Sequence, residues 1–487
     1  LVRLRRYQRY AHPAQARLTS MLALSGSGAN RSSQGCPCIV REAPESLDLL
    51  HLHAQYSRKY PHLLQSTGQG RFDILFACPG RSLTLDAAGA LHDGAAGPAP
   101  GDFLATLDDW WSAYRTTGCE DTGLPFHGGW FVYLGYELAG QVEPRLRLPS
   151  PDDGMPVALA TRFVSAIVHD NTSGRTVIVA EAGHEEQVAG IERDIEGLSP
   201  VGMPGLADNC SYGITEAPPE DYRQAVSRIL DYIREGDVFQ VNLSREWQVV
   251  ADRAVDIPAL YRRLMQHNPS PFGGMACRDG AAIVSSSPER LVSVQGRTVE
   301  TRPIAGTRPR SNNRAADDAW AQELMSHPKE QAEHIMLIDL ERNDLGRICR
   351  PGTVQVDEFM VLESYAHVHH IVSNIRGELR DDVTPGQVIR AVFPGGTITG
   401  CPKVRCMEII AELEQEPRGA YTGSMGYINR DGSMDLNILI RTMTVAGDRI
   451  RLRAGAGIVA DSVPEAELEE TRAKARGLLR ALGMADA

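Results

Sequence analysis

Helix-like and strand-like segments follow one another in irregular order along this chain, and this order constrains the fold more than any other feature. Residues 71–77 and 128–135 are apolar runs typical of strands. A later segment carries apolar residues at helical spacing, namely Val226, Ile229, Leu230 and Ile233. Gly236 is expected to end that helix. Parallel α/β folds alternate strand and helix regularly, so the mixed order predicts an α+β fold.

The patterns elsewhere predict further elements of both kinds. Residues 86–100 have the Ala, Gly, Asp and Pro content of turns and a loop. Ile450, Leu452 and Ala454 alternate with arginines as in a half-buried strand, which Gly455-Ala-Gly is expected to break. Helices are expected over residues 317–339, 404–412 and 464–482.

The 487 residues are enough for two to four domains. Residues 200–218 are rich in Gly, Pro and polar residues and form the best boundary, so we expect domains over 46–205 and 216–484. Residues 1–45 are expected to be a disordered extension. Its first 41 residues contain arginines but no Asp or Glu, as in a transit peptide. Alternatively, the sequence is extended upstream of a natural start at Met21, and we favour this second interpretation.

Charge and cysteine usage exclude several classes of protein. A net charge of −12 disfavours a broad nucleic-acid surface, which needs clustered positive charge. The nine cysteines show no regular spacing and fit reduced thiols in a cytosol. No run of 18 apolar residues suggests a membrane span. These properties favour a cytoplasmic protein.

Two glutamates are candidates for a metal site. Glu333 and Glu470 lie in separate helix-like segments. Mg²⁺ is often held by one or two carboxylates, with substrate oxygens and water filling the other positions. Taken alone, each glutamate also fits a solvated helix position, and Glu470 with Lys474 fits an ordinary i,i+4 ion pair.

Glycine-rich segments and a histidine pair can likewise be interpreted either as parts of a binding site or as purely structural features. Residues 393–403 precede a helix, so their backbone N–H groups could hold an anion or form a plain tight loop. Gly455 and Gly457 could let a carboxylate approach the backbone or could form a bulge. His369-His370 is more often structural than catalytic. No phosphate loop or dinucleotide-binding glycine pattern is present.

Together these segments resemble one family, the chorismate-utilising enzymes, which include anthranilate, aminodeoxychorismate, isochorismate and salicylate synthases. The motifs occur in the family order over about residues 220–482. They are Ser287-Pro-Glu, Pro303-Ile-Ala-Gly-Thr, the segments around Glu333 and His370, residues 393–403, Ile440-Arg-Thr and residues 455–474. The resemblance implies the fold of anthranilate synthase component I, in which large mixed or antiparallel sheets pack as a sandwich with helices outside.

The resemblance also implies a role for each matching residue. Glu333 and Glu470 would hold Mg²⁺ against the ring carboxylate of chorismate. The residues that would bind the substrate carboxylates are Tyr421, Arg441, Gly455, Gly457 and Lys474. His370 and Thr397 would line the ring, and Glu289 would be the general acid that helps the 4-hydroxyl group leave.

One position indicates the nucleophile. Family members that add water resemble one another in having a Lys base where this chain has Gln240. Gln cannot deprotonate water, so the resemblance implies ammonia. This chain is not similar to a glutaminase in any segment, and we expect ammonia from a separate glutamine amidotransferase subunit or from free ammonium.

Two amine-adding members remain. Gln240-Val-Asn-Leu, His369-His370 and Gly395-Gly-Thr look more like aminodeoxychorismate synthase component I, which makes 4-amino-4-deoxychorismate for 4-aminobenzoate and folate. Ala305 looks instead like anthranilate synthase component I, because many aminodeoxychorismate synthases have Lys there. We expect the former, with the latter as alternative.

The N-terminal part carries one more motif. Leu63-Leu-Gln-Ser resembles the tryptophan-binding segment of the family, so Leu64 and Ser66 are candidate effector contacts. The third residue is usually Glu, and Gln65 leaves regulation, a structural tryptophan and an empty core pocket as alternatives.

Overall fold

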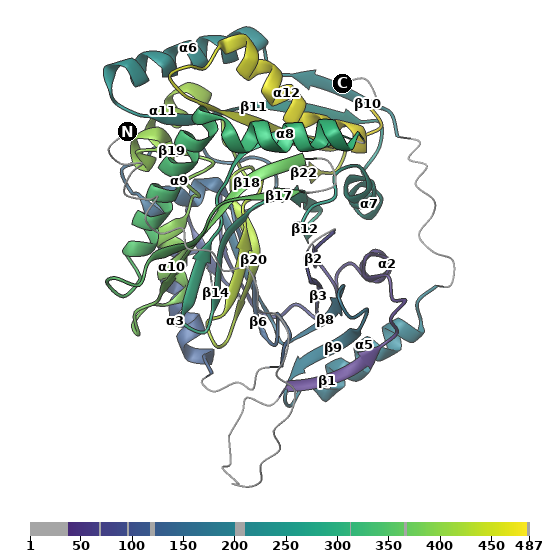
Figure 1. The fold of residues 1–487 in the computed structure, drawn as a ribbon. Coiled ribbons are helices and arrows are strands. Elements are labelled where there is room, and N and C mark those ends of the chain that lie inside the picture. Colours follow the sequence, from purple (N-terminus) through teal and green to yellow (C-terminus); the bar gives the residue numbers. More distant parts are fainter. Residues whose placement is uncertain are drawn as a thin grey trace. The chain divides into compact units, whose positions relative to one another are not determined.

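The structure is a computed structural model that describes residues 38–67, 70–94, 97–116, 122–199, 210–311, 313–364 and 368–484. These residues belong to one compact unit, Cys36–Ala487. Two large antiparallel sheets pack against each other, and helices lie outside them (Figure 1). The predicted α+β sandwich is confirmed.

The first sheet has twelve strands and runs through both halves of the chain. Its order is β1 (Cys38–Ala43), β9 (Thr176–Glu181), β8 (Ser165–Asp170), β3 (Phe72–Ala77), β2 (His62–Gln65), β12 (Phe272–Arg278), β13 (Ala281–Ser287), β22 (Thr442–Ala446), β23 (Arg449–Ile458), β11 (Gln240–Ala251) and β10 (Tyr212–Glu216), and β19 (Gly400–Cys401) pairs with β11.

The second sheet has eleven strands. Its order is β16 (Ile304–Pro309), β18 (Val368–Glu378), β15 (Thr298–Thr301), β14 (Arg290–Gln295), β21 (Met434–Asn437), β20 (Ser424–Asn429), β6 (Gly129–Leu134), β7 (Ala158–Phe163), β4 (Ser82–Leu85) and β5 (Leu91–Asp93), and β17 (Gln355–Ser364) pairs with β18. Phe76 of the first sheet packs on Phe131 and Phe163 of the second, with ring centroids 5.4 and 5.3 Å apart.

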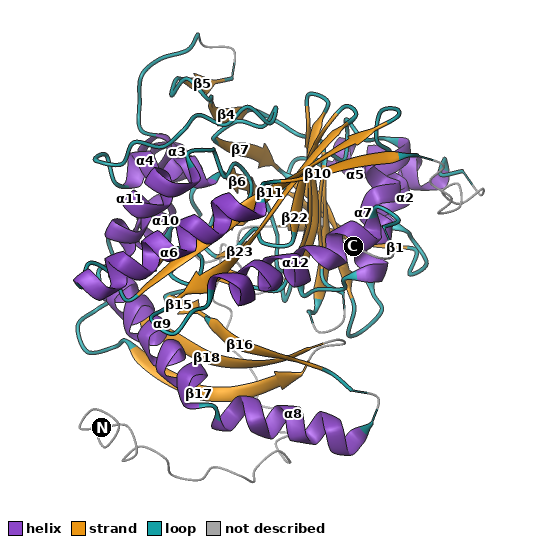
Figure 2. Ribbon diagram, turned by 90° about the horizontal axis from the view of Figure 1, so that it is seen from above, coloured by secondary structure: helices purple, strands orange, loops and turns teal. Residues whose placement is uncertain are grey.

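Helices cover the outer faces of both sheets. Those that contact the first sheet are α2 (Leu49–Gln55), α5 (Glu185–Glu196), α6 (Pro219–Glu235), α7 (Ile257–His267), α11 (Lys403–Glu414) and α12 (Pro464–Ala481). Those that contact the second sheet or pack beside it are α3 (Phe103–Tyr114), α8 (Arg314–Ser326), α9 (Pro328–Gly346) and α10 (Pro385–Val392). Figure 2 shows α8 and α9 beside β16, β17 and β18. Two short segments, η2 (Tyr136–Leu138) and α4 (Ala139–Val142), follow β6.

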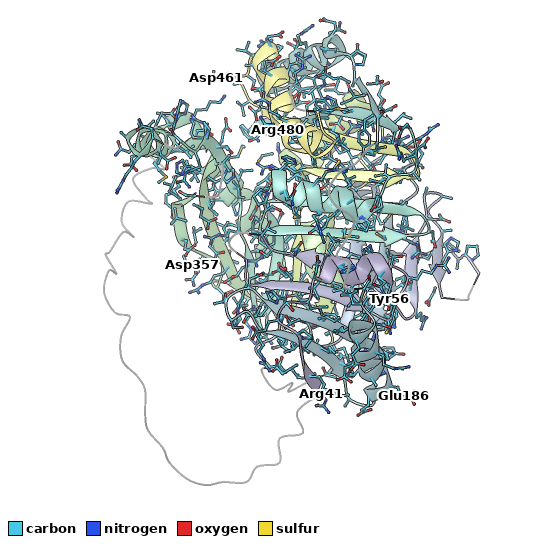
Figure 3. The ribbon with its side chains drawn as sticks, turned by 90° about the vertical axis from the view of Figure 1, so that its right-hand side faces the viewer. Arg41, Tyr56, Glu186, Asp357, Asp461 and Arg480 are labelled. Atoms are coloured by element: carbon cyan, nitrogen blue, oxygen red, sulfur yellow. The ribbon has the colours of Figure 1, made fainter. Side chains whose placement is uncertain are left out.

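Strands from before and after the predicted boundary pair directly. Leu63 of β2 pairs with Met275 of β12 in the first sheet, and β6 pairs with β20 in the second. Residues 200–209, at the boundary itself, lie outside the described residues, and the division into 46–205 and 216–484 stays a prediction. Figure 3 shows Arg41 of β1 and Glu186 of α5 at one end of the molecule and Asp461 and Arg480 at the other.

Several boundaries differ from the sequence predictions. Strand β1 lies inside the expected disordered extension, whose residues 1–37 are outside the described part. The single helix expected over 317–339 is two helices, because Pro328 begins a new one after His327. The loop expected over 86–100 contains β5.

The expected break at Gly455-Ala-Gly is also wrong. Strand β23 continues through these residues to Ile458, pairing with β11 throughout. The pairing partner supplies the hydrogen bonds that keep glycine extended. By contrast, α6 ends as predicted, with Gly236 in the left-handed conformation (φ 84°). Among the described residues, no helix combines the length and apolar character that crossing a membrane requires.

Candidate active site

The ten residues expected to bind or convert the substrate come from eight separate segments, and the structure brings these segments together. Gly455 and Gly457 lie on β23, Glu470 and Lys474 on α12, Glu333 on α9 and His370 on β18. Glu289 follows β13, Thr397 follows α10, and Tyr421 and Arg441 flank β20–β21. Figure 1 shows α12 lying across the strands that carry the glycines.

Glu289 is a buried carboxyl with the environment of a general acid. Its side chain is 5% exposed, and its Oε1 has no hydrogen-bond partner among the described residues. Burial raises the pKa of Glu289 to about 7, against opposing effects of the Thr397 hydroxyl, the Ile304 N–H, and the charges of Lys474 and Arg441. A carboxyl that titrates near neutral pH can deliver a proton under physiological conditions.

The two glycines of β23 pack against strand β11 and, in the case of Gly455, also against Tyr421. A Cβ on Gly455 would lie 2.7 Å from the Tyr421 hydroxyl oxygen, and one on Gly457 would lie 2.5 Å from Gln240 Nε2. The Lys474 ammonium donates to the Gly455 carbonyl at 2.9 Å. Neighbouring atoms therefore fill the space that side chains at positions 455 and 457 would need, so both positions require glycine, and the Lys474 ammonium lies at the carbonyl of the first.

Arg441 is held in an unusual conformation. Its φ of 52° is in the left-handed region, which a residue with a side chain rarely adopts. The Ser286 N–H donates to the Arg441 carbonyl at 3.1 Å and fixes this turn beside Glu289. Burial lowers the pKa of Arg441, and the Glu289 charge opposes the change. Strained backbone of this kind is concentrated at functional sites.

His370 is neutral in this environment. Burial lowers its pKa to about 4, and the Arg441 charge lowers it further. Its Nδ1 is 3.0 Å from the Thr307 hydroxyl and 3.3 Å from the Gly306 carbonyl. The carbonyl favours the tautomer with the proton on Nδ1. His370 therefore acts here as a neutral hydrogen-bonding group and not as an imidazolium.

The candidate metal ligands lie in a group of four carboxylates from α9 and α12. Burial raises the pKa of Glu333 to about 7; Lys329 opposes the change, and Glu330, Glu467 and Glu470 add to it. Glu467 is 8% exposed. Among the described residues no group of three or more His, Cys, Asp or Glu side chains is placed to hold a metal ion.

A divalent cation here would have at most Glu333 and Glu470 as a pair of protein ligands and would need substrate oxygens or water at its other positions, since Glu330 is paired with Arg308 at 3.2 Å. Carboxylate oxygens are hard donors, and their mutual repulsion at Glu333 is what a cation would relieve. Sequence reasoning missed Glu330 and Glu467. They stand three positions before Glu333 and Glu470 on the same helices, and this i,i+3 repeat was the available signal.

A buried ion network lies under the site. Arg418 and Glu414 have side chains 1% and 2% exposed and are 2.6 Å apart, and Arg453 bonds Glu414 at 3.1 Å. Arg418 also donates to the carbonyls of Asn242 on β11, at 2.8 Å, and Ile398 beside Thr397, at 3.1 Å. It therefore ties two substrate-facing segments to the loop before Tyr421. Sequence analysis did not identify it.

Leu64 and Ser66 lie elsewhere. They line a cavity of about 1030 Å³ between the two sheets, together with Phe72, Met425 and Asn437. The Ser66 N–H and Gln65 Nε2 donate to Asp73 at 2.8 and 3.0 Å, so Gln65 is part of the wall. The cavity matches the expected effector position, and tryptophan binding stays a prediction.

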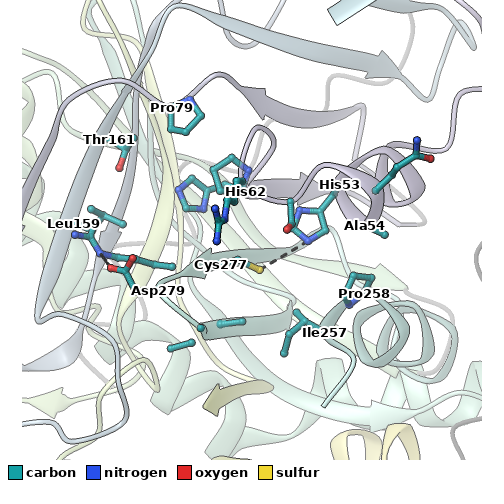
Figure 4. A pocket seen from close by; sticks show the side chains of 18 of the residues that line it. His53, Ala54, His62, Pro79, Leu159, Thr161, Ile257, Pro258, Cys277 and Asp279 are labelled. Carbon is teal, nitrogen blue, oxygen red and sulfur yellow. Dashed lines mark hydrogen bonds and ion pairs between the residues drawn. The ribbon is translucent and has the colours of Figure 1, made fainter. Parts of the chain in front are cut away.

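Another large cavity, of about 1100 Å³, is separate from all these residues. It lies beside α2, the β12–β13 turn and the start of α7 (Figure 4). His53 Nε2 is 3.9 Å from Cys277 Sγ at its wall. Burial raises the pKa of the Cys277 thiol to about 12, which makes it a poor nucleophile.

Comparisons with known proteins agree with this geometry. The family model of the chorismate binding enzymes matches residues 61–480. Aminodeoxychorismate synthase component 1 of Bacillus subtilis is 39% identical over 442 residues, which are 88% of this chain and 93% of that protein. Anthranilate synthase component 1 of Thermus thermophilus is 45% identical over 371 residues, which are 74% and 79% of the two chains.

Solved structures show the same relationship. The crystal structure of anthranilate synthase component I from Streptococcus pneumoniae superposes with a TM-score of 0.75 at 32% identity, covering 85% of this chain and 93% of that one. The family model, the relatives and the fold all indicate the same family. The chain therefore belongs to the chorismate binding enzyme family and is a chorismate-utilising enzyme of the anthranilate synthase component I type.

Proposed function

We propose that this chain is an aminodeoxychorismate synthase component I, which converts chorismate and ammonia to 4-amino-4-deoxychorismate. The observation that carries the proposal is the extent of the match to the Bacillus subtilis enzyme, which spans 88% of this chain, whereas the matches to the anthranilate synthases of Thermus thermophilus and Pseudomonas putida span 74% and 81%. The N-terminal part thus contributes to that likeness.

The site supplies a route for the chemistry. Lys474 and Arg441, beside the glycines of β23, bind and orient the substrate carboxylates through charge-assisted hydrogen bonds. Glu289 gives its proton to the leaving 4-hydroxyl group, for which hydroxide alone would be a poor leaving group. Bound Mg²⁺, held by Glu333 and Glu470 with Glu330 and Glu467 beside them, would stabilise negative charge on the substrate carboxylate.

Gln240 supports ammonia as the nucleophile. It lies on β11 with its amide against Gly457, and its Oε1 has no hydrogen-bond partner among the described residues. A neutral amide cannot take a proton from water, but its oxygen can accept a hydrogen bond from ammonia. Ammonia would come from a separate glutamine amidotransferase subunit.

One observation favours anthranilate synthase component I as a second candidate. Ala305 of β16 pairs with Ile371 beside His370. It has no group that could attack chorismate, and it stands where many aminodeoxychorismate synthases have Lys.

The product separates the two candidates. We expect chorismate, Mg²⁺ and ammonium to yield 4-aminobenzoate only after an aminodeoxychorismate lyase is added, measured by chromatography. Fluorescent anthranilate formed without the lyase would instead assign the second candidate. No turnover even at high ammonium would contradict both.

The carboxylates assigned to Mg²⁺ give a further prediction. Glu333→Ala or Glu470→Ala should lower Mg²⁺-dependent turnover by at least about a hundredfold, because a lost ligand weakens the metal and its hold on substrate. Initial rates across a Mg²⁺ titration would measure this.

Glu469→Ala is the matched control. Glu469 is the neighbour of Glu470 on α12, and its side chain is 59% exposed and paired with Arg472. It should keep wild-type Mg²⁺ dependence and a native circular dichroism spectrum. Equal Mg²⁺ dependence in all three variants would remove the metal assignment.

A further inference from the structure

Strand β11 carries a second carboxamide beside Gln240, and the proposed reaction gives it no role. Side chains alternate between the two faces of a strand. Val241 and Leu243 lie in an apolar cluster on one face of β11. Gln240 and Asn242 therefore share the other face, which is the face turned toward the glycines of β23.

Both carboxamides are buried, and each keeps an oxygen without a partner. Gln240 is 6% exposed and Asn242 is 8% exposed. Neither Gln240 Oε1 nor Asn242 Oδ1 has a hydrogen-bond partner among the described residues. Ser244, the next residue on this face, differs, because its hydroxyl donates to the Glu414 carboxylate at 2.9 Å. A buried acceptor without a donor costs free energy, so two neighbouring ones suit a ligand that donates hydrogen bonds.

The glycines of β23 make room for these two side chains. A Cβ on Gly455 would lie 2.9 Å from Asn242 Oδ1, and one on Gly457 would lie 2.5 Å from Gln240 Nε2. Asn242 is paired directly with Gly457, so its carboxamide leans along the strand toward Gly455. The two carboxamides therefore lie side by side over the two glycines.

The backbone around both residues is held by hydrogen bonds to other segments. The Asn242 N–H donates to the Thr399 carbonyl at 2.9 Å, and the Asn242 carbonyl accepts from Arg418 at 2.8 Å. The Gln240 carbonyl accepts from the Cys406 thiol at 3.0 Å. These contacts fix the spacing at which the two side chains leave the strand.

That spacing fits a single nitrogen atom. A strand rises about 3.3 Å per residue, so the side chains at positions 240 and 242 start roughly 6.6 Å apart. Two N–H···O bonds of about 2.9 Å from one nitrogen span about 5.8 Å. Chorismate would bring two carboxylates, which cannot donate, and one hydroxyl group, which is assigned to Glu289. Ammonia is the reactant with several N–H donors on one atom.

We propose that Asn242 and Gln240 together form the ammonia-binding site, in which each carboxamide oxygen accepts one N–H bond and the lone pair of the nitrogen stays free to react. The inference rests on the proposed function only for ammonia as the nucleophile, and it holds for either product. Asn242 would thus contact the nucleophile itself and set the concentration at which the enzyme uses ammonia.

Asn242→Leu tests the site, because leucine keeps the size of the side chain and removes the acceptor. We expect KM for ammonium to rise about tenfold, as for the loss of one buried hydrogen bond. KM for chorismate and kcat at saturating ammonium should stay within about threefold of wild type. Initial rates of chorismate consumption at fixed pH, with each substrate varied in turn, would measure the three constants.

The split between the two KM values separates binding of ammonia from a purely structural role. An unchanged KM for ammonium, or equal rises in both KM values, would overturn the proposal. Asn242→Ala removes the same oxygen without apolar bulk, and it should give the same selective rise if leucine disturbs packing.

Asn242→Asp tests whether the oxygen is the group that matters. Aspartic acid keeps the shape of asparagine and offers an acceptor oxygen whether or not it is protonated. Its KM for ammonium should therefore stay within about threefold of wild type. A rise as large as that of Asn242→Leu would show that the Nδ2 amino group is needed instead, which would overturn the proposal.

Gln248→Leu is the matched control on the same strand. Gln248 lies on the same face of β11, but it is exposed, and its carboxamide donates to the Glu246 carboxylate at 2.7 Å. All three constants should keep their wild-type values. A rise in KM for ammonium as large as that of Asn242→Leu would indicate a general disturbance of β11 and would overturn the proposal.

The product assay keeps this inference separate from the proposed function. If anthranilate is the product, the proposed function fails, and a selective rise in KM for ammonium in Asn242→Leu still supports the ammonia site. If 4-amino-4-deoxychorismate is the product and Asn242→Leu keeps the wild-type KM for ammonium, the ammonia site alone fails.

Discussion

Replacing Glu289 with glutamine is expected to reduce kcat for chorismate by about 10²–10⁴-fold, the usual contribution of a positioned general acid. Glutamine keeps the size and hydrogen-bonding capacity of the side chain, but it cannot release a proton. Because the role proposed for Glu289 is proton donation to the leaving group and not binding of the carboxylates, the dissociation constant for chorismate should change little. Stopped-flow turnover and calorimetric binding would measure the two effects separately.

The control for this variant is Glu192→Gln, on the exposed face of α5. It should match wild type in rate and affinity. If Glu289→Gln retains more than about a tenth of wild-type kcat at pH 7, another group supplies the proton, and the acid assignment is wrong.

Replacing Arg418 with leucine is expected to have the largest effect on stability, about 3–5 kcal/mol. The change leaves the Glu414 carboxylate in a position where its side chain is 2% exposed. It also removes the donors to the carbonyls of Asn242 and Ile398. Ser244 and Arg453 would still donate to the two oxygens of Glu414, but the carboxylate would lose one of its two cationic partners. Urea unfolding followed by circular dichroism would give the loss in free energy.

A matched exposed ion pair provides the comparison. Arg234 pairs with Asp231 on α6 at 2.7 Å, with side chains 70% and 49% exposed. Arg234→Leu should cost less than about 1 kcal/mol, since solvent already screens the pair. Similar losses in the two variants would show that the buried network contributes no more than a surface ion pair.

The fold class and most individual elements could be predicted because they follow from local patterns. The 3.6-residue period and the glycine stop of α6 are properties of one segment, as is the apolar run of β6. The predictions failed where a neighbour decided the outcome. Gly455-Ala-Gly stays extended because β11 supplies its hydrogen bonds, and β1 forms because β9 pairs with it.

The general acid and the substrate-binding candidates were accessible from ordered motifs, whereas the burial of Glu341 was not. In the sequence, Glu341 is one acid in a helical segment with many charged residues. Only the packing of α9 on the strand after Glu289 removes it from solvent.

By itself, the sequence determined the α+β class, the family and its chorismate chemistry, because these depend on residue types in a fixed order. Tertiary structure alone decided that the sheets run across the predicted boundary, that the charges of α12 act on Glu333 of α9, and that Arg418 joins three segments of the site. These features depend on burial and on distances between residues far apart in the chain, and both quantities arise only when the strands pair and the helices pack.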